Sequence, residues 1–477
     1  FGLNKDSGLS KIKNIKEFFD LERRADLKGL EVGDYSLWSY LRIYYSEKFL
    51  IAGSRGSQPG IRLAAEGLKA LSYGLRYLSG KYDYLAIIAG NQRKEINGKW
   101  VHPLDLLPPD IRRKTLFIEL PVLGHKKRSE LPDPRVVSRF WMILREFLWT
   151  KTRRVEKNDV YAATAHELEK LFGVSVRVEF LLKRFFAGRA VMDSVLDRYR
   201  PKAVFCAVGS SNMNYILACK ERGIPVIEIQ HGYIGTTHST YNLVRDLGAK
   251  LYPDYFLAWG EYEREFFSDP ANHFIPAGRV FPVGNFYLES IYRRGMKIRP
   301  AYRERLKRFT NTVAMSVQDP LEGDMLPFIV ETAALLPAVA FLILPRTMGE
   351  AHYRSRFDLP DNVVFFPELN TYEGIIIADV HTTIWSTMAF ESLAFGRANL
   401  LINPGNMAKN MFGHLLDEKK STLYADSPAD FVEKLPLALA ITGANSQTAS
   451  NYFFRKGFEK NIAGAVEEIL AEKSVRC

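Results

Sequence analysis

Two segments of the chain combine side chains that move protons with side chains that bind phosphate. In the first, the carboxylate Glu228 stands inside an apolar run that ends at His231, and Tyr233 and His238 follow. We expect His231 to act as a general base or to donate to a phosphate, since its neutral form is available near pH 7. A structural alternative stays open, with the imidazole bonded to a backbone carbonyl and Glu228 in an ion pair.

The second segment gathers an imidazole, several hydroxyl groups and a carboxylate at the start of a predicted helix: His381, Thr382, Ser386, Thr387 and Glu391. One hydroxyl is enough to cap a helix, so the remaining donors and the free backbone N–H groups suit a phosphate. Glu391, about one turn into the helix, is expected to accept hydrogen bonds from ribose hydroxyls. The alternative is simple capping with Glu391 exposed to solvent.

Further polar candidates follow two other predicted strands. Arg346 comes directly after a buried strand, where its guanidinium would make a bidentate contact with a diphosphate or a sugar carboxylate. A surface ion pair is the alternative for this arginine. The loop 91–105, between the first two predicted strands, carries more polar groups than a connection needs. Those with chemical capacity are Asn91, Arg93, His102 and Asp105.

Alternating strands and helices must hold these segments in place. Apolar runs at 203–209 and 224–230 flank a helical pattern at 213–222, which is the β-loop-α-β unit of a parallel sheet. The second half repeats this rhythm, with strands predicted at 312–317, 339–344, 363–366, 379–381 and 398–402. In open parallel sheets a ligand binds beyond the carboxyl ends of the strands, which is where the polar segments stand.

The predicted fold class is therefore α/β, with two Rossmann-like parallel-sheet domains and a helical N-terminal segment over residues 1–80. A basic helical stretch at 289–308 separates the two strand and helix series and marks the hinge. The predicted domain bounds are 1–295 and 309–440. The helices of 441–477 are expected to cross back onto the first domain.

Composition narrows the class of protein. With 477 residues, 47% of them hydrophobic and 25% charged, the chain is typical of a folded protein of about two or three domains. The net charge of +11 favours an acidic partner, such as a phosphorylated substrate, an anionic membrane surface or nucleic acid. Three cysteines without zinc or disulfide spacing indicate a reducing, cytosolic setting. No apolar run reaches the roughly 18 residues that span a bilayer, so we expect a chain that is neither integral to a membrane nor exported.

Several motifs that would decide the chemistry are absent from the sequence. It has no Walker P-loop, GxGxxG turn, HExxH, paired CxxC, Asp-x-Asp or GxSxG. Their absence disfavours simple NTPases, dinucleotide oxidoreductases, zinc enzymes and α/β-hydrolases. We therefore expect no bound metal and no cofactor.

Several segments, taken in order, resemble bacterial GT-B glycosyltransferases of capsule and lipopolysaccharide assembly, including Kdo transferase and glycerophosphotransferase relatives. They are IPVIEIQHG, YPDYFLAWG, VFPVGN, FLILPRT and HTTIWSTMAFESLAFGRANLLIN, and they cover roughly 203–403. The resemblance implies two domains facing a cleft, with a nucleotide-activated donor held by the second domain and the acceptor by the first. Leu344-Pro345-Arg346 departs from the His-Pro of many relatives that use CMP-activated acids, which leaves the donor open.

The resemblance also implies roles for the candidate residues. The donor contacts are Arg346, His381, Thr382, Ser386, Thr387 and Glu391, and the acceptor contacts are Asn91, Arg93, His102, Tyr233 and His238. His231 ranks first as the base that deprotonates the acceptor, ahead of Glu228, His102 and Asp105. In a retaining mechanism, either of these two carboxylates would be a nucleophile instead.

The predicted function is metal-independent transfer of a sugar from a nucleotide donor to a growing, lipid-linked bacterial surface glycan. The aromatic, basic segments 139–154 and 180–184 would touch anionic lipid headgroups at the inner face of the cytoplasmic membrane, unless they are ordinary core-packing helices. Other polysaccharide-assembly enzymes are expected as partners. The alternatives are a nucleotide-sugar epimerase or hydrolase, and a noncatalytic partner or RNA-binding protein. Nucleic acid is disfavoured because no arm rich in Lys and Arg is interleaved with aromatics on the predicted strands.

Overall fold

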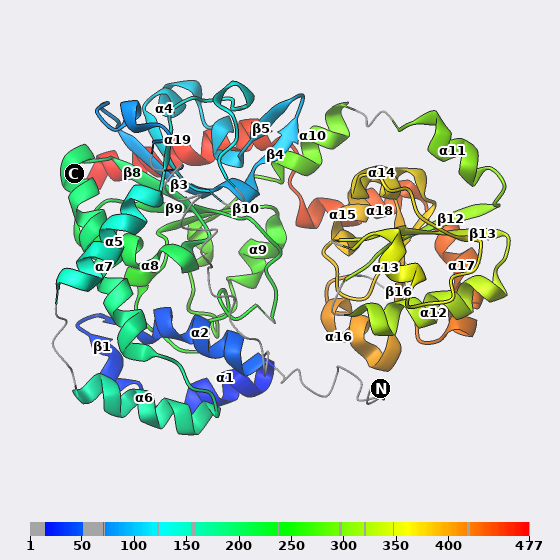
Figure 1. Ribbon diagram of the computed structural model, residues 1–477, viewed down its shortest axis with the longest axis horizontal. Coiled ribbons are helices and arrows are strands. Elements are labelled where there is room, and N and C mark those ends of the chain that lie inside the picture. Colours follow the sequence, from blue (N-terminus) through cyan, green and yellow to red (C-terminus); the bar gives the residue numbers. More distant parts are fainter. Residues whose placement is uncertain are drawn as a thin grey trace. The chain divides into compact units, whose positions relative to one another are not determined.

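The computed structural model describes residues 15–50, 70, 72–121, 124–153, 159–236, 238–294, 298–318, 321–346, 348–416 and 420–476 (Figure 1). Contacts divide the chain into two compact units. The first contains the chain up to Val283 together with Gly457–Cys477, and the second contains Gly284–Lys456. These units differ from the predicted bounds 1–295, 309–440 and 441–477, because α10 (Phe286–Arg294) and α18 (Gly443–Phe453) group with the second sheet.

Seven parallel strands form the sheet of the first unit, in the order β11-β10-β9-β8-β3-β6-β7. They are β3 (Tyr84–Ala89), β6 (Thr115–Leu120), β7 (Val136–Ser138), β8 (Ala203–Ala207), β9 (Val226–Ile229), β10 (Tyr255–Ala258) and β11 (Val280–Pro282). Nearly all of their side chains are buried, as expected for a parallel sheet with helices over both faces.

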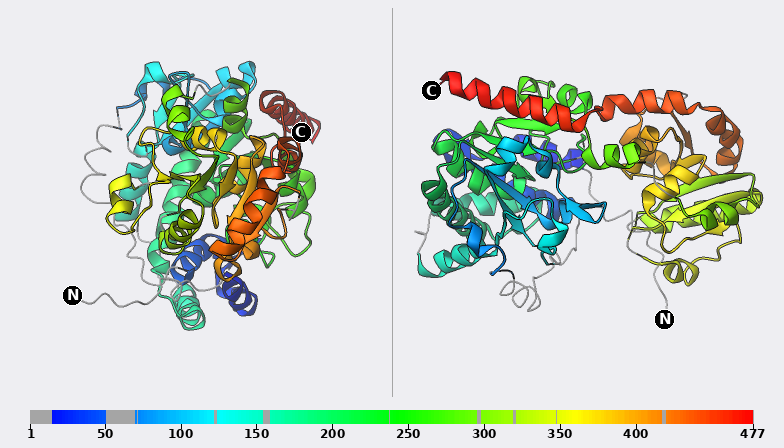
Figure 2. Two further views of the ribbon diagram at one scale, coloured as in Figure 1. Left: turned by 90° about the vertical axis from the view of Figure 1, so that its right-hand side faces the viewer. Right: turned by 90° about the horizontal axis from the view of Figure 1, so that it is seen from above.

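Helices cover this sheet. α5 (Phe140–Thr152), α7 (Val178–Tyr199) and α8 (Met213–Glu221) pack against one another and share a core with the central strands. The shorter α4 (Pro109–Arg113) and α9 (Glu261–Phe266) lie in connections between strands. The last helix, α19 (Phe458–Arg476), belongs to this unit and lies along it (Figure 2). It is held at β10, where the Tyr255 hydroxyl donates to Glu472 at 2.9 Å.

The N-terminal segment is helical, as predicted. α1 (Ile15–Arg24), α2 (Trp38–Leu50) and α6 (Asp159–Phe172) pack around an aromatic core, and the ribbon of β1 (Glu31–Val32) and β2 (Tyr35–Ser36) separates α1 from α2. The ring centroids of Phe18 and Trp38 lie 5.0 and 5.5 Å from that of Phe172. The predicted segment also included 1–14 and 51–69, which lie outside the described residues.

Six parallel strands form the sheet of the second unit, in the order β14-β13-β12-β15-β16-β17. They are β12 (Asn311–Ser316), β13 (Val339–Leu344), β14 (Val363–Val364), β15 (Val380–Thr382), β16 (Ala398–Ile402) and β17 (Thr422–Ala425). The helices of this unit, besides α10 and α18, are α11 (Pro300–Leu306), α12 (Glu322–Leu335), α13 (Glu350–Arg354), α14 (Thr371–Ile377), α15 (Met388–Ala394), α16 (Met407–Phe412) and α17 (Pro428–Ala440).

The predicted fold class is confirmed, since each unit is a Rossmann-like parallel sheet with helices and a helical segment precedes the first sheet. Some elements were not predicted. The loop 91–105 contains the hairpin of β4 (Lys94–Ile96) and β5 (Lys99–Val101). The edge strands β7 and β17 were not predicted either. None of the helices in the described ranges is long and apolar enough to cross a bilayer.

Both sheets reverse their strand order at one point. In the first unit, β3 leads outward through β6 to β7, and β8 then returns to the other side of β3. In the second unit, β12 leads through β13 to β14, and β15 returns to the other side of β12. Ligands of open α/β sheets bind beyond the carboxyl ends of the strands at such a reversal. The ends of β3 and β8, and those of β12 and β15, are therefore where functional side chains are expected.

Candidate functional site

The loop that follows β15 carries most of the predicted phosphate-binding residues, and hydrogen bonds hold it against the end of β12. The Thr383 hydroxyl donates to the backbone oxygen of Ser316 at 2.9 Å, and the backbone N–H of Trp385 donates to Oε1 of Gln318 at 2.8 Å. On the other side, the indole of Trp385 donates to the backbone oxygen of Met407 at 3.1 Å. The loop is thereby fixed at the strand reversal of the second sheet.

His381 lies inside this sheet and is completely buried. Its Nε2 is 3.0 Å from the Ser316 hydroxyl, and its Nδ1 is 2.9 Å from Oδ1 of Asn399. Because an amide oxygen only accepts, Nδ1 carries the proton and Nε2 accepts from the serine. Burial lowers the pKa of His381 to about 4, so the ring is neutral at pH 7. With both nitrogens occupied, His381 supports the loop and does not reach a ligand, which corrects its expected role as a donor contact.

The hydroxyls of this loop differ in their access to a ligand. Thr382 is completely buried, and its Oγ1 has no hydrogen-bond partner among the described residues, so it too is corrected as a direct contact. Ser386 and Thr387 are half-buried, and Ser386 Oγ accepts a long bond of 3.3 Å from the backbone of Met388. Because α15 has only seven residues, its helix dipole is short. Side-chain donors would therefore contribute more than the dipole to binding an anionic ligand. Ser386 and Thr387 are therefore the hydroxyls that a ligand can reach.

Glu391 is oriented by an aromatic neighbour. It is 7% exposed, its Oε2 accepts from the Tyr372 hydroxyl, and its Oε1 lies 3.5 Å from the Thr387 hydroxyl. Burial and the adjacent carboxylate raise the pKa of Tyr372 well above its ordinary value, so the phenol keeps its proton. This carboxylate is thus held beneath Thr387 with little surface to offer a ribose. Sequence reasoning missed Tyr372, which carries no motif.

Arg346 follows β13, at the other side of β12. Its side chain is exposed, and no hydrogen bond or ion pair within the described ranges engages it. The alternative of a surface ion pair for this arginine is therefore not found within those ranges. An exposed guanidinium beside the reversal point is the cation that a phosphate or carboxylate group of a ligand would need.

In the first unit, the carboxyl ends of three adjacent strands present polar side chains at one edge. Asn91 follows β3, Ser210 and Ser211 follow β8, and His231 follows β9. Neighbouring strands lie about 4.8 Å apart, so the ends of β3 and β9 are separated by about 10 Å. Asn91, Ser211 and His231 are exposed. The predicted acceptor residue Asn91 and the predicted base His231 therefore share an edge of the sheet, close to the strand reversal.

Glu228 turns inward from this edge and is completely buried. Its Oε1 accepts from the backbone N–H of Gly209 at 2.9 Å and from the Tyr241 hydroxyl at 2.8 Å. Burial raises its pKa to about 7. A Cβ added to Gly209 would lie 2.3 Å from Oε2, so the carboxyl fits only against glycine. Enclosed in this way, Glu228 does not reach a substrate, which corrects its expected role as a base or nucleophile.

The turn after β8 is strained. Val208 has a left-handed backbone, with φ 60° and ψ 68°, directly before Gly209. A β-branched residue in this region costs on the order of 1–3 kcal/mol, and such strain gathers at functional sites. The turn delivers the Gly209 N–H to Glu228 and leaves Ser211 exposed at the edge. No pattern in the sequence signals it.

His231 is exposed, whereas His238 and Tyr233 are half-buried. Desolvation by the surrounding chain and the nearby His238 lower the pKa of His231, and burial lowers the pKa of His238. Both rings are therefore neutral at pH 7, which is the state that a general base needs. The Tyr233 ring lies parallel to that of Tyr262, with 6.1 Å between centroids, and burial raises its pKa to about 12.

The remaining predicted residues form a closed, buried cluster. Arg93 Nη1 is 2.8 Å from Asp105 Oδ2, and Arg93 Nε donates to Glu119. The backbone N–H of His102 donates to the same Asp105 oxygen at 2.8 Å, and its ring accepts from the backbone of Leu104. All three predicted residues are at most 2% exposed. The cluster braces the β4–β5 hairpin against β6, which corrects Arg93 and His102 as acceptor contacts and Asp105 as a catalytic carboxylate.

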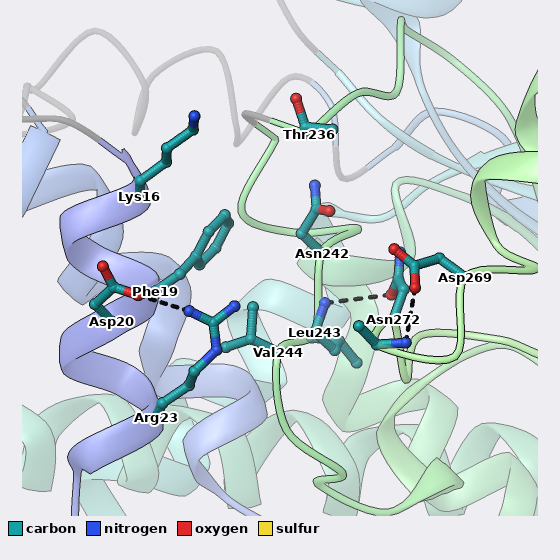
Figure 3. Close-up of a pocket in the computed structure, with 11 residues that line it drawn as sticks. Lys16, Phe19, Asp20, Arg23, Thr236, Asn242, Leu243, Val244, Asp269 and Asn272 are labelled. Carbon is teal, nitrogen blue, oxygen red and sulfur yellow. Dashed lines mark hydrogen bonds and ion pairs between the residues drawn. The ribbon is translucent and has the colours of Figure 1, made fainter.

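A cavity of about 350 Å³ lies beside the segment that follows His231 (Figure 3). Lys16, Phe19 and Arg23 of α1 form one wall. The other wall is formed by Thr236, Asn242, Leu243, Val244, Asp269, Ala271 and Asn272. The lining contains two cations, Lys16 and Arg23, and two carboxylates, Asp20 and Asp269, and Arg23 pairs with Asp20 at 2.7 Å. A balanced charge together with an aromatic ring and amide groups suits a neutral, hydroxyl-rich ligand better than a phosphate. The sequence did not indicate this cavity.

Neither unit offers a metal site within the part of the chain that the structure describes, where no group of three or more His, Cys, Asp or Glu side chains could hold an ion. Cys206 and Cys219 are buried free thiols. Burial raises the pKa of both, so they stay protonated and act as small apolar core residues.

The chain was also compared with known proteins. No family model and no curated protein matches the sequence. Among solved structures, a UDP-GlcNAc 2-epimerase from Neisseria meningitidis bound to UDP-GlcNAc is 11% identical, with a TM-score of 0.44 over 83% of this chain and 100% of that one. A glycosyltransferase from Rickettsia africae is 12% identical, with a TM-score of 0.49 over 82% of this chain and 98% of that one. The calicheamicin glycosyltransferase is 13% identical, with a TM-score of 0.48 over 82% of this chain and 99% of that one.

Proposed function

We propose that this protein is a glycosyltransferase that takes a sugar from a nucleotide-activated donor, with the nucleotide bound by the second unit. The observation that carries the proposal is the position of the loop after β15. It stands at the strand reversal of the second sheet, where open α/β sheets bind their ligands, and it is held there by Thr383 and Trp385. Its accessible hydroxyls, Ser386 and Thr387, are suited to phosphate oxygens.

The same residues suit the departure of a nucleotide. When the bond between sugar and phosphate breaks, negative charge develops on the phosphate, and donors already in place stabilise that charge most effectively. Ser386 and Thr387 supply hydroxyl donors, and the exposed Arg346 supplies a full positive charge. We propose that these groups make a metal ion unnecessary.

We propose His231 as the base that removes the proton from the acceptor hydroxyl. It is exposed, it is neutral at pH 7, and it stands at the carboxyl edge of the first sheet. The rival carboxylates Glu228 and Asp105 are both buried. The acceptor would approach the same edge, where Asn91 and Ser211 offer hydrogen bonds, and we propose a growing bacterial surface glycan in this role because of the sequence segments within 203–403.

A thermal-shift screen of the full chain with CMP, CDP, UDP, GDP, ADP and dTDP tests donor binding. Nucleotides that share one base should stabilise the protein strongly, and the others weakly. Replacing both hydroxyls, Ser386→Ala with Thr387→Val, should weaken binding by about tenfold or more, since a hydrogen bond to a charged group contributes roughly 1.5–3 kcal/mol. Thr448→Val on the exposed face of α18 is the matched control. No response to any nucleotide, or an unchanged response in the double variant, would contradict the proposal.

The reaction is tested next with nucleotide sugars of the base that stabilises the chain. A transferase releases nucleotide only when a glycan acceptor is added. Release without an acceptor, or conversion of the donor sugar alone, would instead support a nucleotide-sugar hydrolase or epimerase.

A further inference from the structure

Large apolar side chains are exposed together on two helices of the first unit. Leu144, Phe147 and Leu148 of α5 are 40%, 54% and 51% exposed, and Phe180 of α7 is 47% exposed. Each helix also has an inward face, where Met142, Leu181, Leu182 and Phe185 are buried. The exposed residues are therefore not part of the core that these helices build with the sheet.

The positions of these residues bring them onto one surface. On α5, residues 144, 147, 148 and 151 follow the spacing of a single helix face. α5 and α7 pack side by side in opposite directions, since Arg145 donates to Ser194 at 3.1 Å and the Glu146 carboxylate lies against Gly188. In this arrangement Lys151, near the end of α5, comes alongside the turn of α7 that carries Arg184, and Phe180 lies about one turn closer to the start of α7.

The charges around these side chains are mostly positive. Lys151 lies 5.5 Å from the Phe147 ring centroid, and Arg177 and Arg184 lie 4.9 and 5.9 Å from that of Phe180. Arg145 and Arg153 are exposed on α5 as well. Of the nearby acids, Glu146 is turned inward to the Tyr215 hydroxyl, and Glu179 remains exposed.

We infer that this surface, made of Leu144, Phe147, Leu148, Phe180, Lys151 and Arg184, docks onto an anionic lipid bilayer. Aromatic and leucine side chains suit the boundary between headgroups and acyl chains, and the surrounding cations complement lipid phosphates. A neutral apolar partner would not require cations beside both exposed phenylalanines, Lys151 at Phe147 and Arg177 and Arg184 at Phe180. Charge complementarity therefore selects the anionic membrane over a second copy of this basic chain.

The surface is narrower than the sequence indicates. Within 139–154, Arg139 points into the unit, where it donates to Asn212 at 2.8 Å and stacks on Tyr215. Within 180–184, only Phe180 and Arg184 are exposed. Arg154 lies outside the described residues. The contact is therefore made by one face of each helix, and it does not depend on nucleotide binding by the second unit.

Co-sedimentation of the full chain with lipid vesicles tests this inference. The protein should bind vesicles of phosphatidylcholine mixed with phosphatidylglycerol at least about tenfold more tightly than phosphatidylcholine alone, and added salt should weaken the binding. Phe147→Ser with Phe180→Ser should reduce binding by about tenfold or more, and Lys151→Glu with Arg184→Glu should remove the preference for anionic lipid.

Matched controls use residues away from this surface. Leu335→Ser with Leu437→Ser replaces two leucines that are 53% and 59% exposed in the second unit, and Lys28→Glu with Lys307→Glu replaces two exposed lysines. Both control pairs should bind vesicles like the unaltered chain, and circular dichroism should show every variant folded. Equal binding by the surface variants, or no binding by the unaltered chain, would overturn the inference. A self-associating chain that becomes monomeric in Phe147→Ser with Phe180→Ser would also overturn it, by showing an interface between copies.

Discussion

The hydroxyl of Tyr241 donates to Oε1 of Glu228 at 2.8 Å, while Oε2 of the same carboxyl is buried without a hydrogen-bond partner among the described residues. Among the residues that the structure describes, two donors, Tyr241 and the backbone of Gly209, compensate for the complete burial of this group. Burial prevails, and it raises the pKa of Glu228 to about 7 from an ordinary 4.5. The folded protein therefore holds a proton here that the unfolded chain releases near pH 5.

This proton makes the stability of the fold depend on pH. Between pH 4.5 and about pH 7 the folded state binds the proton and the unfolded state does not, so stability falls as pH rises and levels off above pH 7. Glu228→Gln should remove this pH dependence. The difference in free energy of unfolding, variant minus unaltered chain, should therefore be larger at pH 8 than at pH 5 by on the order of 1–3 kcal/mol. Urea unfolding from pH 5 to pH 8 measures it. Glu467→Gln, at an exposed position of α19, is the matched control. It should keep the pH dependence of the unaltered chain, whereas an unchanged pH dependence in Glu228→Gln would contradict the prediction.

The close fit of Gly209 against Glu228 predicts a steric effect. A methyl group at position 209 would lie 2.3 Å from Glu228 Oε2, in a buried site where the carboxyl is held by hydrogen bonds. Gly209→Ala should destabilise the protein by roughly 1–3 kcal/mol. Gly278→Ala is the control, because a Cβ there meets nothing within 4 Å.

A double-variant cycle assigns this cost to the pair. If the clash is with the carboxyl, Gly209→Ala should cost less in a Glu228→Ala background, with a coupling of about 0.5 kcal/mol or more. Additive effects in urea unfolding would show that the methyl group clashes with something else.

Removal of the proposed base should affect turnover and spare donor binding. His231→Gln should lower sugar transfer by about 10² to 10⁴-fold, the usual contribution of a general base, with an unchanged nucleotide thermal shift. His166→Gln, at an exposed position of α6, is the matched control. Because desolvation and His238 lower the pKa of His231, transfer should stay constant as pH falls through 6.5 and decline only at lower pH. A decline centred at pH 6.5 or above would contradict this assignment.

Asn399 should stabilise the fold through its hydrogen bond to His381. Its Oδ1 accepts from the His381 ring at 2.9 Å and from the Ser392 hydroxyl at 2.9 Å. Asn399→Leu leaves the buried N–H of His381 without an acceptor, at a cost of about 1–3 kcal/mol. It also leaves the Ser392 hydroxyl with only its longer bond of 3.3 Å to the backbone oxygen of Ala389. Urea unfolding should therefore show a loss of at least about 1 kcal/mol, whereas Asn445→Leu on the exposed face of α18 should cost little. Nitrogen NMR of the unaltered chain should find the proton on Nδ1 of His381, and a proton on Nε2 would refute the network.

The order of strands and helices could be predicted from the sequence because each central strand is a continuous apolar run. Residues 339–344 and 398–402 were predicted with the bounds that the structure shows. A continuous apolar run is buried on both faces, and the interior of a parallel sheet covered by helices is where such a strand is stable. The strand can therefore be recognised from its own residues, without knowledge of distant ones. The short edge strands β7 and β17 lack such a run, and they form because a neighbouring strand offers its hydrogen bonds.

The chemistry of each candidate side chain depended on the tertiary structure. The sequence alone determined that polar groups follow the apolar runs, and hence that carboxylates, imidazoles and hydroxyls gather at strand ends. Only the fold decided that His231 is exposed while Glu228, three residues earlier, is enclosed by Gly209 and Tyr241. It likewise joined His381 to Ser316, 65 residues away in the chain. The reason is physical: local order fixes where a strand ends, whereas burial and hydrogen bonding, which set proton affinity and access, come from chain segments that meet only when the protein folds.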